Sequence, residues 1–274
     1  MLILFKNRAK LRNYFDMCKF FCTFALDSRA MTILSHIMTS LFSLLYPRVC
    51  PMCGAYIEEE ADARRICEAC LQTLPRTEQA SLAQNATEMA LLSEGKYMSA
   101  TKRAMHLERA AAFLFFEKEH PIQFAVHAMK YADRPEIGHF LGKQAAMEMQ
   151  YAGFFEDIDV IVPMPLHPRR LRERGYNQSE YIARGISEIT GIPVDTTHVT
   201  RIKNTPKQAL QSGEGRKTNV VDAFAVNHPE QMYHKHILLV DDLITTGETV
   251  KACLHAMRAF RGAQFSVFAL CKAR

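Results

Sequence analysis

Short β-branched runs alternate with helical patterns through the C-terminal two thirds of the chain. Runs with a strand composition lie at 109–118, 158–166, 236–240 and 264–273. Between them, apolar residues recur at helical spacing in 121–153, 177–190 and 247–260. Such alternation is typical of a parallel sheet with helices on both faces. We therefore predict an α/β fold for this part of the chain.

Composition and charge narrow the class of protein only a little. The chain has 274 residues, 48% hydrophobic and 23% charged, which is enough apolar material for a real core. The net charge of +5 is concentrated at the start, because residues 1–30 carry +4 and the remainder +1. Bulk charge therefore does not favour a nucleic-acid ligand for the folded part. No apolar run is long enough to cross a bilayer, and we expect a cytoplasmic protein without membrane insertion.

Composition shifts divide the chain into four expected parts. Residues 1–30 lack a helical or strand period, and we interpret them as a disordered tail or as sequence upstream of a natural start at Met31. Residues 31–75 are expected to hold an amphipathic helix followed by a cysteine module. Residues 76–95 are interpreted as a linker, and residues 96–274 as the α/β domain.

Two Cys-x-x-Cys pairs, separated by thirteen residues, stand ahead of the α/β domain. They comprise Cys50, Cys53, Cys67 and Cys70. Each turn directs two thiolates at one point, and two such turns complete a tetrahedral Zn²⁺ shell. Disulfides would need an oxidising compartment, and redox Cys-x-x-Cys motifs normally occur singly. We predict a structural zinc, because four cysteines leave no open coordination position.

The segment HILLVDDLITTGETV, residues 236–250, joins an apolar run to two acids, a small-residue turn and the start of a helix. Ligands of open parallel sheets bind outside the carboxyl ends of the strands, where Asp241 and Asp242 are expected. Carboxylates there accept hydrogen bonds from ribose hydroxyls, directly or through Mg²⁺. The turn that follows would bind a phosphate through backbone N–H groups and the residues Thr245, Thr246, Gly247 and Thr249. An ordinary βα loop with two solvated acids is the alternative.

The stretch ILLVDDLITTGET resembles the phosphoribosyl diphosphate (PRPP) motif of type I phosphoribosyltransferases. With YPRVCPMCG and VPMPLHPRRLRERGYNQSEYIA, it makes the chain after residue 30 similar to the ComF family, whose members include competence, DNA-uptake and GntX-like proteins. The resemblance implies a type I phosphoribosyltransferase-like parallel sheet with a small N-terminal zinc ribbon, and PRPP with Mg²⁺ at residues 241–249. It also implies a catalytic role for Asp241 and Asp242. Glu248 departs from the motif, in which a second glycine is frequent.

Four arginines follow the expected strand at 158–166 within one short segment. They are Arg169, Arg170, Arg172 and Arg174. Guanidinium groups match phosphate oxygens in a bidentate fork, so we predict that the segment binds the diphosphate of PRPP. Single-stranded DNA is the rival ligand, with Tyr176 available for base stacking. A solvated basic loop is the third interpretation.

Other basic residues carry a weaker signal. Lys130 and Arg134 flank a helix break and could reach an anion, but a solvated surface role explains them equally well. Residues 201–216 are interpreted as a mobile flap that closes over a ligand, with Gly213 and Gly215 permitting the motion. The basic residues of this flap are Arg201, Lys203, Lys207 and Arg216.

These features support two functions of different classes. The first is Mg²⁺-dependent transfer of a phosphoribosyl group from PRPP to an unknown acceptor, in which the protein mainly positions the reactants and stabilises charge. The second is a non-catalytic role in DNA uptake, in which the chain binds single-stranded DNA and a helicase-type ATPase partner. A third interpretation has the zinc module docking another chain. We favour the first function, although the sequence names no acceptor.

Overall fold

The computed structural model describes residues 49–57, 65–78, 87, 106–203 and 223–274. All of them belong to one compact unit, Val49–Arg274. Several predictions lie outside the described residues: the tail at 1–30, the helix expected after Met31, most of the linker, and the flap beyond Lys203.

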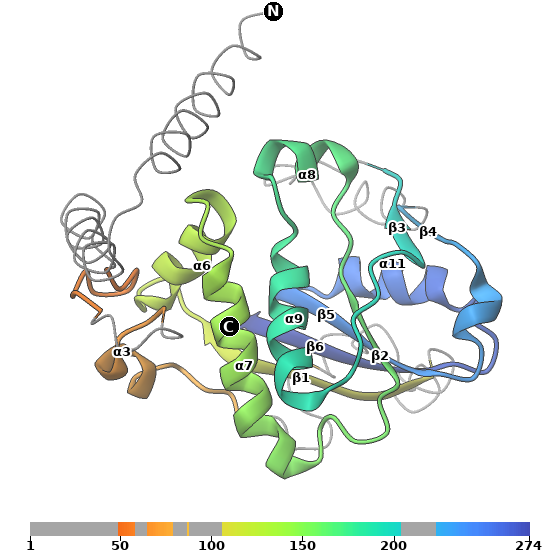
Figure 1. The fold of residues 1–274 in the computed structure, drawn as a ribbon, viewed down its shortest axis with the longest axis horizontal. Coiled ribbons are helices and arrows are strands. Elements are labelled where there is room, and N and C mark those ends of the chain that lie inside the picture. Colours follow the sequence, from red (N-terminus) through yellow and green to blue (C-terminus); the bar gives the residue numbers. More distant parts are fainter. Residues whose placement is uncertain (1–48, 58–64, 79–86, 88–105, 204–222) are drawn as a thin grey trace, which may run out of the picture. The chain divides into compact units, whose positions relative to one another are not determined.

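A four-stranded parallel sheet forms the centre of the described fold (Figure 1). Its spatial order is β1 (Leu107–Phe116), β6 (Gln264–Ala273), β5 (His236–Ile244) and β2 (Val160–Pro163). The central strands β5 and β6 are buried along nearly their whole length, which explains their almost continuous apolar composition. All three strand pairings are parallel, as the alternation of strands and helices predicts.

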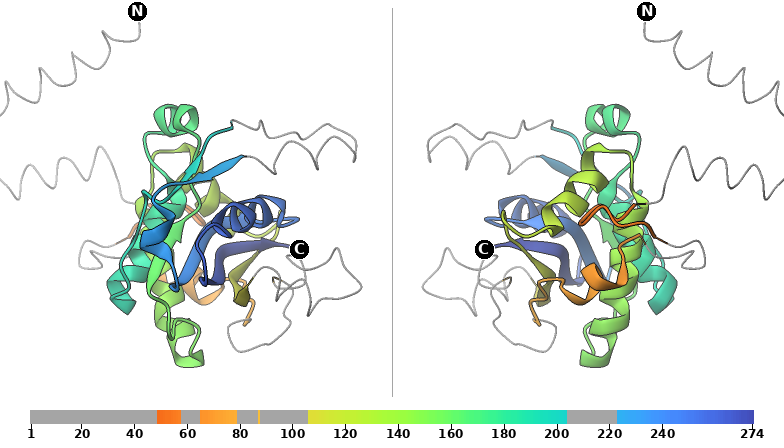
Figure 2. Two further views of the ribbon diagram at one scale, coloured as in Figure 1. Left: turned by 90° about the vertical axis from the view of Figure 1, so that its right-hand side faces the viewer. Right: turned by 90° about the vertical axis from the view of Figure 1, so that its left-hand side faces the viewer.

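Helices cover both faces of this sheet. The described helices are α3 (Glu68–Gln72), α6 (Ile122–Tyr131), α7 (Glu136–Met149), α8 (Pro168–Arg174), α9 (Gln178–Thr190) and α11 (Glu248–Met257), with the 3₁₀ turns η2 (Gln150–Ala152) and η3 (Pro229–Met232). Leu238 and Val240 of β5 share one core cluster with α6, α7 and α9, whereas Ile237 and Leu239 share the other with α11. In the side views of Figure 2, the green helices α7 and α9 and the blue helix α11 lie on opposite sides of the strands. The predicted fold class is confirmed.

Two glycines allow α7 and α9 to cross closely. A Cβ atom at Gly142 would lie 2.3 Å from the carbonyl oxygen of Ile182, and one at Gly185 would lie 2.1 Å from that of His139. Cβ atoms do not approach oxygen so closely, so any larger residue would push the helices apart. This crossing determines where the first turn of α9 lies against β5.

A short antiparallel hairpin lies outside the main sheet. Its strands are β3 (Val199–Arg201) and β4 (Phe224–Val226). Phe224 packs in the same core cluster as α11, so the hairpin belongs to that face of the sheet. The two strands bracket the segment 204–222, which includes most of the predicted flap.

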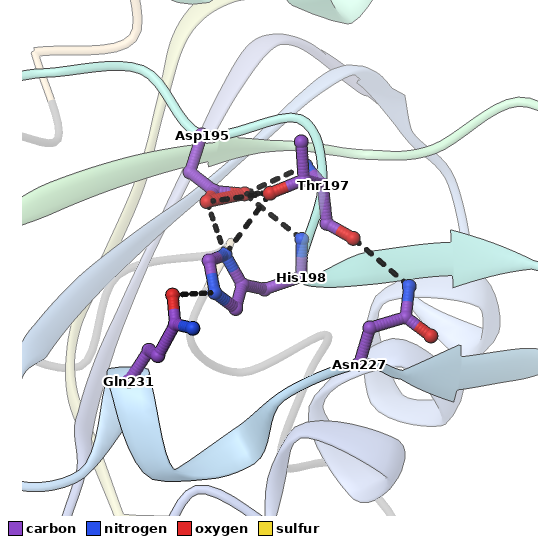
Figure 3. A network of polar contacts seen from close by, with 5 residues as sticks. All are labelled: Asp195, Thr197, His198, Asn227 and Gln231. Atoms are coloured by element: carbon purple, nitrogen blue, oxygen red, sulfur yellow. Dashed lines mark hydrogen bonds and ion pairs between the residues drawn. The ribbon is translucent and has the colours of Figure 1, made fainter.

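A polar network holds the base of this hairpin (Figure 3). The carboxylate of Asp195 accepts hydrogen bonds from the backbone N–H groups of Thr197 at 2.7 Å and His198 at 3.0 Å. The ring of His198 bridges Asp195 and the Oε1 atom of Gln231, the latter at 3.0 Å. The Asn227 amide donates to the Thr197 carbonyl oxygen at 2.9 Å and ties the two ends of the hairpin together. The network therefore anchors β3 and β4.

The cysteine module packs directly on the α/β domain. Its buried side chains join the core cluster that contains α6 and α7: Cys50, Met52, Ile66, Cys70 and Leu74. Arg76 forms an antiparallel bridge with Leu114 of β1, and its guanidinium pairs with Glu148 of α7 through contacts of 2.6 and 2.7 Å. The chain that leaves the module thus adds to the edge of the sheet, and the two parts share one hydrophobic core.

Candidate functional site

The four predicted zinc ligands converge on one point. The sulfur atoms of Cys50, Cys53, Cys67 and Cys70 all lie within 4.8 Å of one another. The Sγ atoms of Cys53 and Cys67 are 3.6 Å apart, close to the edge of about 3.8 Å expected for a tetrahedron with Zn–S bonds of about 2.3 Å. Gly54 adopts a φ of 74°, and its N–H donates to the Cys50 carbonyl oxygen at 2.8 Å. These residues therefore fit a structural Zn²⁺.

Electrostatics in the cysteine cluster also favour a cation. Burial opposes ionisation of Cys50, but backbone N–H groups of Cys67 and Met52 face its sulfur and lower the pKa of the thiol to about 7. Burial raises the pKa of Cys70, and the neighbouring sulfurs of Cys53 and Cys67 raise it further. A divalent cation among the four sulfurs would reverse this mutual repulsion and hold all four as thiolates.

The two acids of the predicted ligand site lie within β5. We expected the strand to end before them, but β5 continues through Asp241 and Asp242 to Ile244. Both side chains are buried, at 8% and 6% exposure. Because successive strand residues alternate, the charge of Asp241 acts on Cys253 in the α11 core, and that of Asp242 acts on Cys271 in the core of α6 and α7. The two carboxylates are adjacent in sequence, but each acts on a thiol of a different core cluster.

Asp241 is held by uncharged donors. Its Oδ1 atom accepts the backbone N–H of Asp242 at 2.8 Å and the hydroxyl of Ser179, in the first turn of α9, at 3.4 Å. Burial raises the pKa of Asp241 to about 7, and the negative charge of Asp242 contributes to the rise. A group with this pKa changes its charge near neutral pH.

Asp242 forms a buried ion pair with Lys130. The Nζ atom of Lys130 lies 2.9 Å from Oδ2 of Asp242, and the two side chains are 11% and 8% exposed. Burial lowers the pKa of Lys130, but Asp242, together with Asp241 and Cys271, raises it, and the pKa is raised overall. The Lys130 ammonium is therefore the partner of this buried Oδ2 atom. A carboxylate oxygen of this kind can accept a cation or a hydroxyl group.

The solvated role that we considered for Lys130 is therefore wrong. Lys130 lies in the last turn of α6, four residues after Val126, which faces the core. The sequence did contain a signal for this burial: Lys130 continues the helical spacing of the apolar residues that face the core. The signal becomes specific only when the fold brings α6 against the end of β5.

The turn after the acids has the form of an anion-binding loop. Gly247 caps the start of α11 with a φ of 80°, so a glycine is favoured there. Thr245 and Thr246 are exposed, and the Lys272 ammonium donates to the Thr245 carbonyl oxygen at 3.4 Å. Glu248 is 44% exposed and pairs with Lys251 at 3.0 Å, so its charge is partly neutralised beside the helix terminus.

The four arginines lie on α8, at the same edge of the sheet as the acids. The carboxyl ends of β2 and β5 are neighbours, and Met164, just after β2, donates its N–H to the Val240 carbonyl oxygen at 2.8 Å. Arg169 forms an exposed pair with Glu173 at 2.9 Å. The Arg174 guanidinium contacts the side chain of Gln178 and lies 5.6 Å from the centre of the Tyr131 ring. The segment is thus a short helix, although we expected a loop.

Tyr176 is not available for base stacking, which corrects our prediction. The ring is 8% exposed, and its hydroxyl donates to the Met129 carbonyl oxygen at 2.6 Å. Tyr176 therefore anchors the end of α6, one residue before Lys130.

Arg201 joins the site from the hairpin. Its guanidinium lies 5.4 Å from the centre of the Phe224 ring. Burial lowers the pKa of Arg201, the positive charge of Arg170 lowers it further, and Asp241 opposes both. Arg201, Arg170 and Asp241 therefore share one electrostatic environment, which brings together β3, α8 and β5.

Within the part of the chain that the structure describes, no helix combines the length and the hydropathy needed to span a bilayer.

Comparison with known proteins finds one matching family model and several related sequences. A family model described as a double zinc ribbon domain matches residues 41–83. The DNA utilization protein YhgH of Escherichia coli (strain K12) is 32% identical over 155 residues, which cover 56% of this chain and 67% of that protein. Competence protein F of Haemophilus influenzae is 34% identical over 117 residues, which cover 42% of this chain and 51% of that protein.

Two solved structures resemble part of the fold. One is an allosteric regulatory enzyme of purine biosynthesis, with a TM-score of 0.34, 18% identity, and coverage of 52% of this chain and 30% of that one. The other is a hypoxanthine phosphoribosyl transferase of Trypanosoma cruzi, with a TM-score of 0.30, 12% identity, and coverage of 52% and 74%. These superpositions are partial, so the sequence relatives identify the family. Because YhgH matches over two thirds of its length, with a zinc ribbon ahead of the parallel sheet, the chain belongs to the ComF family.

Proposed function

We propose that the protein binds PRPP with Mg²⁺ at residues 241–249, at the carboxyl end of β5. One observation carries the proposal: two buried carboxylates lie directly ahead of a glycine-capped turn and the N-terminus of α11. Carboxylates at this end of a parallel sheet suit ribose hydroxyls or a divalent cation, and the helix terminus suits a phosphate. A ribose 5-phosphate carries both chemical groups at the required ends.

The described residues divide into three roles in this proposal. Asp241 and Asp242 would accept the ribose hydroxyls and Mg²⁺, which supplies positive charge beside the diphosphate when it is bound. The backbone of the turn, with Thr245, Thr246, Gly247 and Thr249, would hold the 5′-phosphate. The arginines of α8 would hold the diphosphate, because α8 follows β2 at the same edge of the sheet.

The activity proposed for this site is phosphoribosyl transfer. The bond between C1′ and the diphosphate oxygen breaks, the diphosphate leaves with both electrons, and a nucleophile of the acceptor forms the new bond at C1′. Positive charge develops on the ribose and negative charge on the leaving group, so nearby carboxylates and guanidinium groups stabilise both. The acceptor brings its own nucleophile, and none of the residues named above is assigned as its general base.

Isothermal titration of PRPP into the zinc-loaded protein tests the proposal. We expect Mg²⁺-dependent binding that weakens at least about tenfold in Asp241→Asn, because a carboxylate–ligand hydrogen bond contributes about 1.5–3 kcal/mol. Asp159→Asn is the matched control, since Asp159 accepts the His236 N–H at 2.8 Å at the opposite end of β5. Absence of PRPP binding to the folded wild type would refute the proposal, and so would equal loss in both variants.

A second candidate function is binding of single-stranded DNA, and a specific surface favours it. Phe124 and Tyr131 of α6 are 55% and 56% exposed, and His127 lies between them with its ring centre 4.8 Å from that of Tyr131. Arg174 brings the arginines of α8 beside this aromatic face. Exposed rings interleaved with guanidinium groups provide stacking and phosphate contacts for unpaired bases. The names of the two relatives, which refer to DNA use and competence, agree with this candidate.

Anisotropy of a labelled oligothymidine measures this second function. Tyr131→Ala should weaken binding by about 1–3 kcal/mol, whereas Tyr151→Ala, at an 89% exposed ring in η2, should not change it. Affinity should also fall steeply with salt, because each phosphate contact releases a counterion. Equal affinity of the Tyr131 and Tyr151 variants would eliminate the surface.

If the protein acts in DNA uptake, we propose that it does so with a helicase-type ATPase partner. We also propose that it works in the cytoplasm, where the zinc-binding thiols remain reduced. Co-purification with a candidate ATPase, before and after Zn²⁺ removal, would test whether the zinc module also docks a partner.

A further inference from the structure

We propose that Lys130 is a built-in counter-cation that makes the site select a complex of a divalent cation with a diphosphate over the free cation. Lys130 would neutralise Asp242 until a ligand supplies a cation for the carboxylate and an anion for the ammonium together. The part that concerns the free cation stands independently, and the part that concerns the complex rests on the proposed PRPP site.

Lys130 and Asp242 form a buried ion pair in which each charge neutralises the other. Their charged atoms are 2.9 Å apart, and the side chains are 11% and 8% exposed, so water screens the pair weakly. The ammonium also interacts electrostatically with Asp241 and with the thiol of Cys271. It is therefore a positive charge that Asp241, Asp242 and Cys271 share. Separating the pair would leave a buried charge without compensation, which costs far more than the pair itself contributes.

The main chain around Lys130 is anchored on both sides. The Tyr176 hydroxyl donates to the Met129 carbonyl oxygen at 2.6 Å. Arg134 donates to the Val49 carbonyl oxygen at 3.2 Å and pairs with Glu136 at 2.9 Å. The end of α6 is thereby attached to the α8–α9 connection and to the zinc module. Any exchange of partners at Lys130 therefore involves its flexible side chain, and the helix remains in place.

Charge balance then determines which ligand can enter. A free divalent cation at Asp242 would have to displace the ammonium and would leave it buried beside a second positive charge. A diphosphate complex brings anionic oxygens that accept Lys130 as the cation takes the carboxylate. The Oδ2 atom of Asp242, which now contacts the ammonium, is the acceptor that the cation would take over in this exchange. Binding of cation and anion should consequently be coupled, each raising the affinity for the other.

A four-protein cycle with Mn²⁺ as the probe tests the first part. The proteins are the zinc-loaded wild type, Lys130→Met, Asp242→Asn and the neutral double variant. Mn²⁺ is not expected to displace Zn²⁺ from four thiolates, since it binds such sites more weakly. We expect electron paramagnetic resonance to record at least about tenfold tighter Mn²⁺ binding in Lys130→Met than in wild type, with the gain lost in the double variant. Equal or weaker binding in a folded Lys130→Met protein would overturn the proposal, since a purely structural pair predicts that result.

A second measurement uses only the wild type and the double variant, in case Lys130→Met does not fold. The preformed Mn²⁺–diphosphate complex should bind the wild type at least about tenfold more tightly than Mn²⁺ alone, and this ratio should shrink in the double variant. An unchanged ratio would overturn the role of the pair. Inorganic diphosphate replaces PRPP in this measurement, so the counter-cation can be supported even if PRPP fails to bind.

Discussion

The cysteine module draws its residues from one short segment of the chain, whereas the acid site combines residues from segments that are far apart in the sequence. All four sulfurs of the module come from residues 50–70, and their convergence within 4.8 Å needs only two local turns. The acid site combines β5 with Lys130 from α6, Ser179 from α9 and Arg201 from the hairpin. When one short segment supplies all four ligands of a metal ion, metal binding stabilises the fold of that segment. The acid site instead gathers buried charges from distant segments, and burial of charges opposes folding.

The energetic roles of the two regions should also be opposite. Zinc binding in a small module is folding free energy, so losing a ligand must destabilise the protein. Burying Asp241 with a pKa raised to about 7 costs stability at neutral pH, so removing its charge should stabilise the protein. Such a cost is common at functional sites.

The largest effect is expected for Cys67→Ser. The variant should lose its zinc and on the order of 5–10 kcal/mol of stability. Because the module shares the core of α6 and α7, we expect the α/β domain to melt with it. Zinc content by mass spectrometry and thermal unfolding by circular dichroism measure both effects.

A second cysteine variant provides the control for that prediction. Cys253→Ala removes a buried thiol of α11 that lies outside the cluster, and should keep the zinc at a cost of about 1–2 kcal/mol. If the Cys67 variant melted in two separate steps, the zinc module would be an independent unit and the shared core would be unimportant.

An intermediate effect of opposite sign is expected for Asp241→Asn. The folded pKa of Asp241, about 7, lies above its ordinary value of 3.8, so the folded state holds the proton more tightly. The stability linked to this group is complete below about pH 4 and is lost as the pH rises through 7. The variant should therefore match the wild type near pH 4 and exceed it by about 2–4 kcal/mol at pH 8.

Urea unfolding of both proteins at each pH measures that difference. Comparison of the variant with the wild type cancels the titration of other groups. A difference independent of pH would mean that the pKa of Asp241 is the same in the folded and unfolded states, and the energetic contrast between the two regions would then be refuted.

The smallest effect concerns the link between the regions. Arg134→Ala removes the hydrogen bond to the Val49 carbonyl oxygen, next to Cys50, and should cost about 1–2 kcal/mol. Arg184→Ala is the control, because its pair with Glu180 is exposed and is worth about 0.3–0.5 kcal/mol. If the zinc module positions Lys130 through α6, only the Arg134 variant should alter Mn²⁺ binding at the acid site. Equal Mn²⁺ affinity in both variants would separate the two regions.

Much of the fold could be predicted because its signals are local. The four strands of the main sheet, the break between α6 and α7, and the glycine that ends α9 all follow from apolar periodicity and backbone preference, whereas the β3–β4 hairpin was not predicted. The predicted end of β5 was wrong. Charged residues usually mark the end of a buried strand, and nothing in the local sequence indicates that Lys130 of α6 pairs with Asp242. The burial of Tyr176 was missed for the same reason, because its partner, Met129, lies 47 residues away.

The sequence by itself determined the zinc module and the class of fold, and it indicated that the acid pair lies near the carboxyl end of a strand. Spacing within a turn and periodicity along a strand act over a few residues, so they can be read from the chain. Tertiary structure alone decided that the two acids act on thiols of different core clusters, that Lys130 neutralises Asp242, and that Arg201 shares the environment of Asp241. Electrostatic partners are selected by distance in space. A buried charge therefore acquires its function only when packing brings a distant residue beside it.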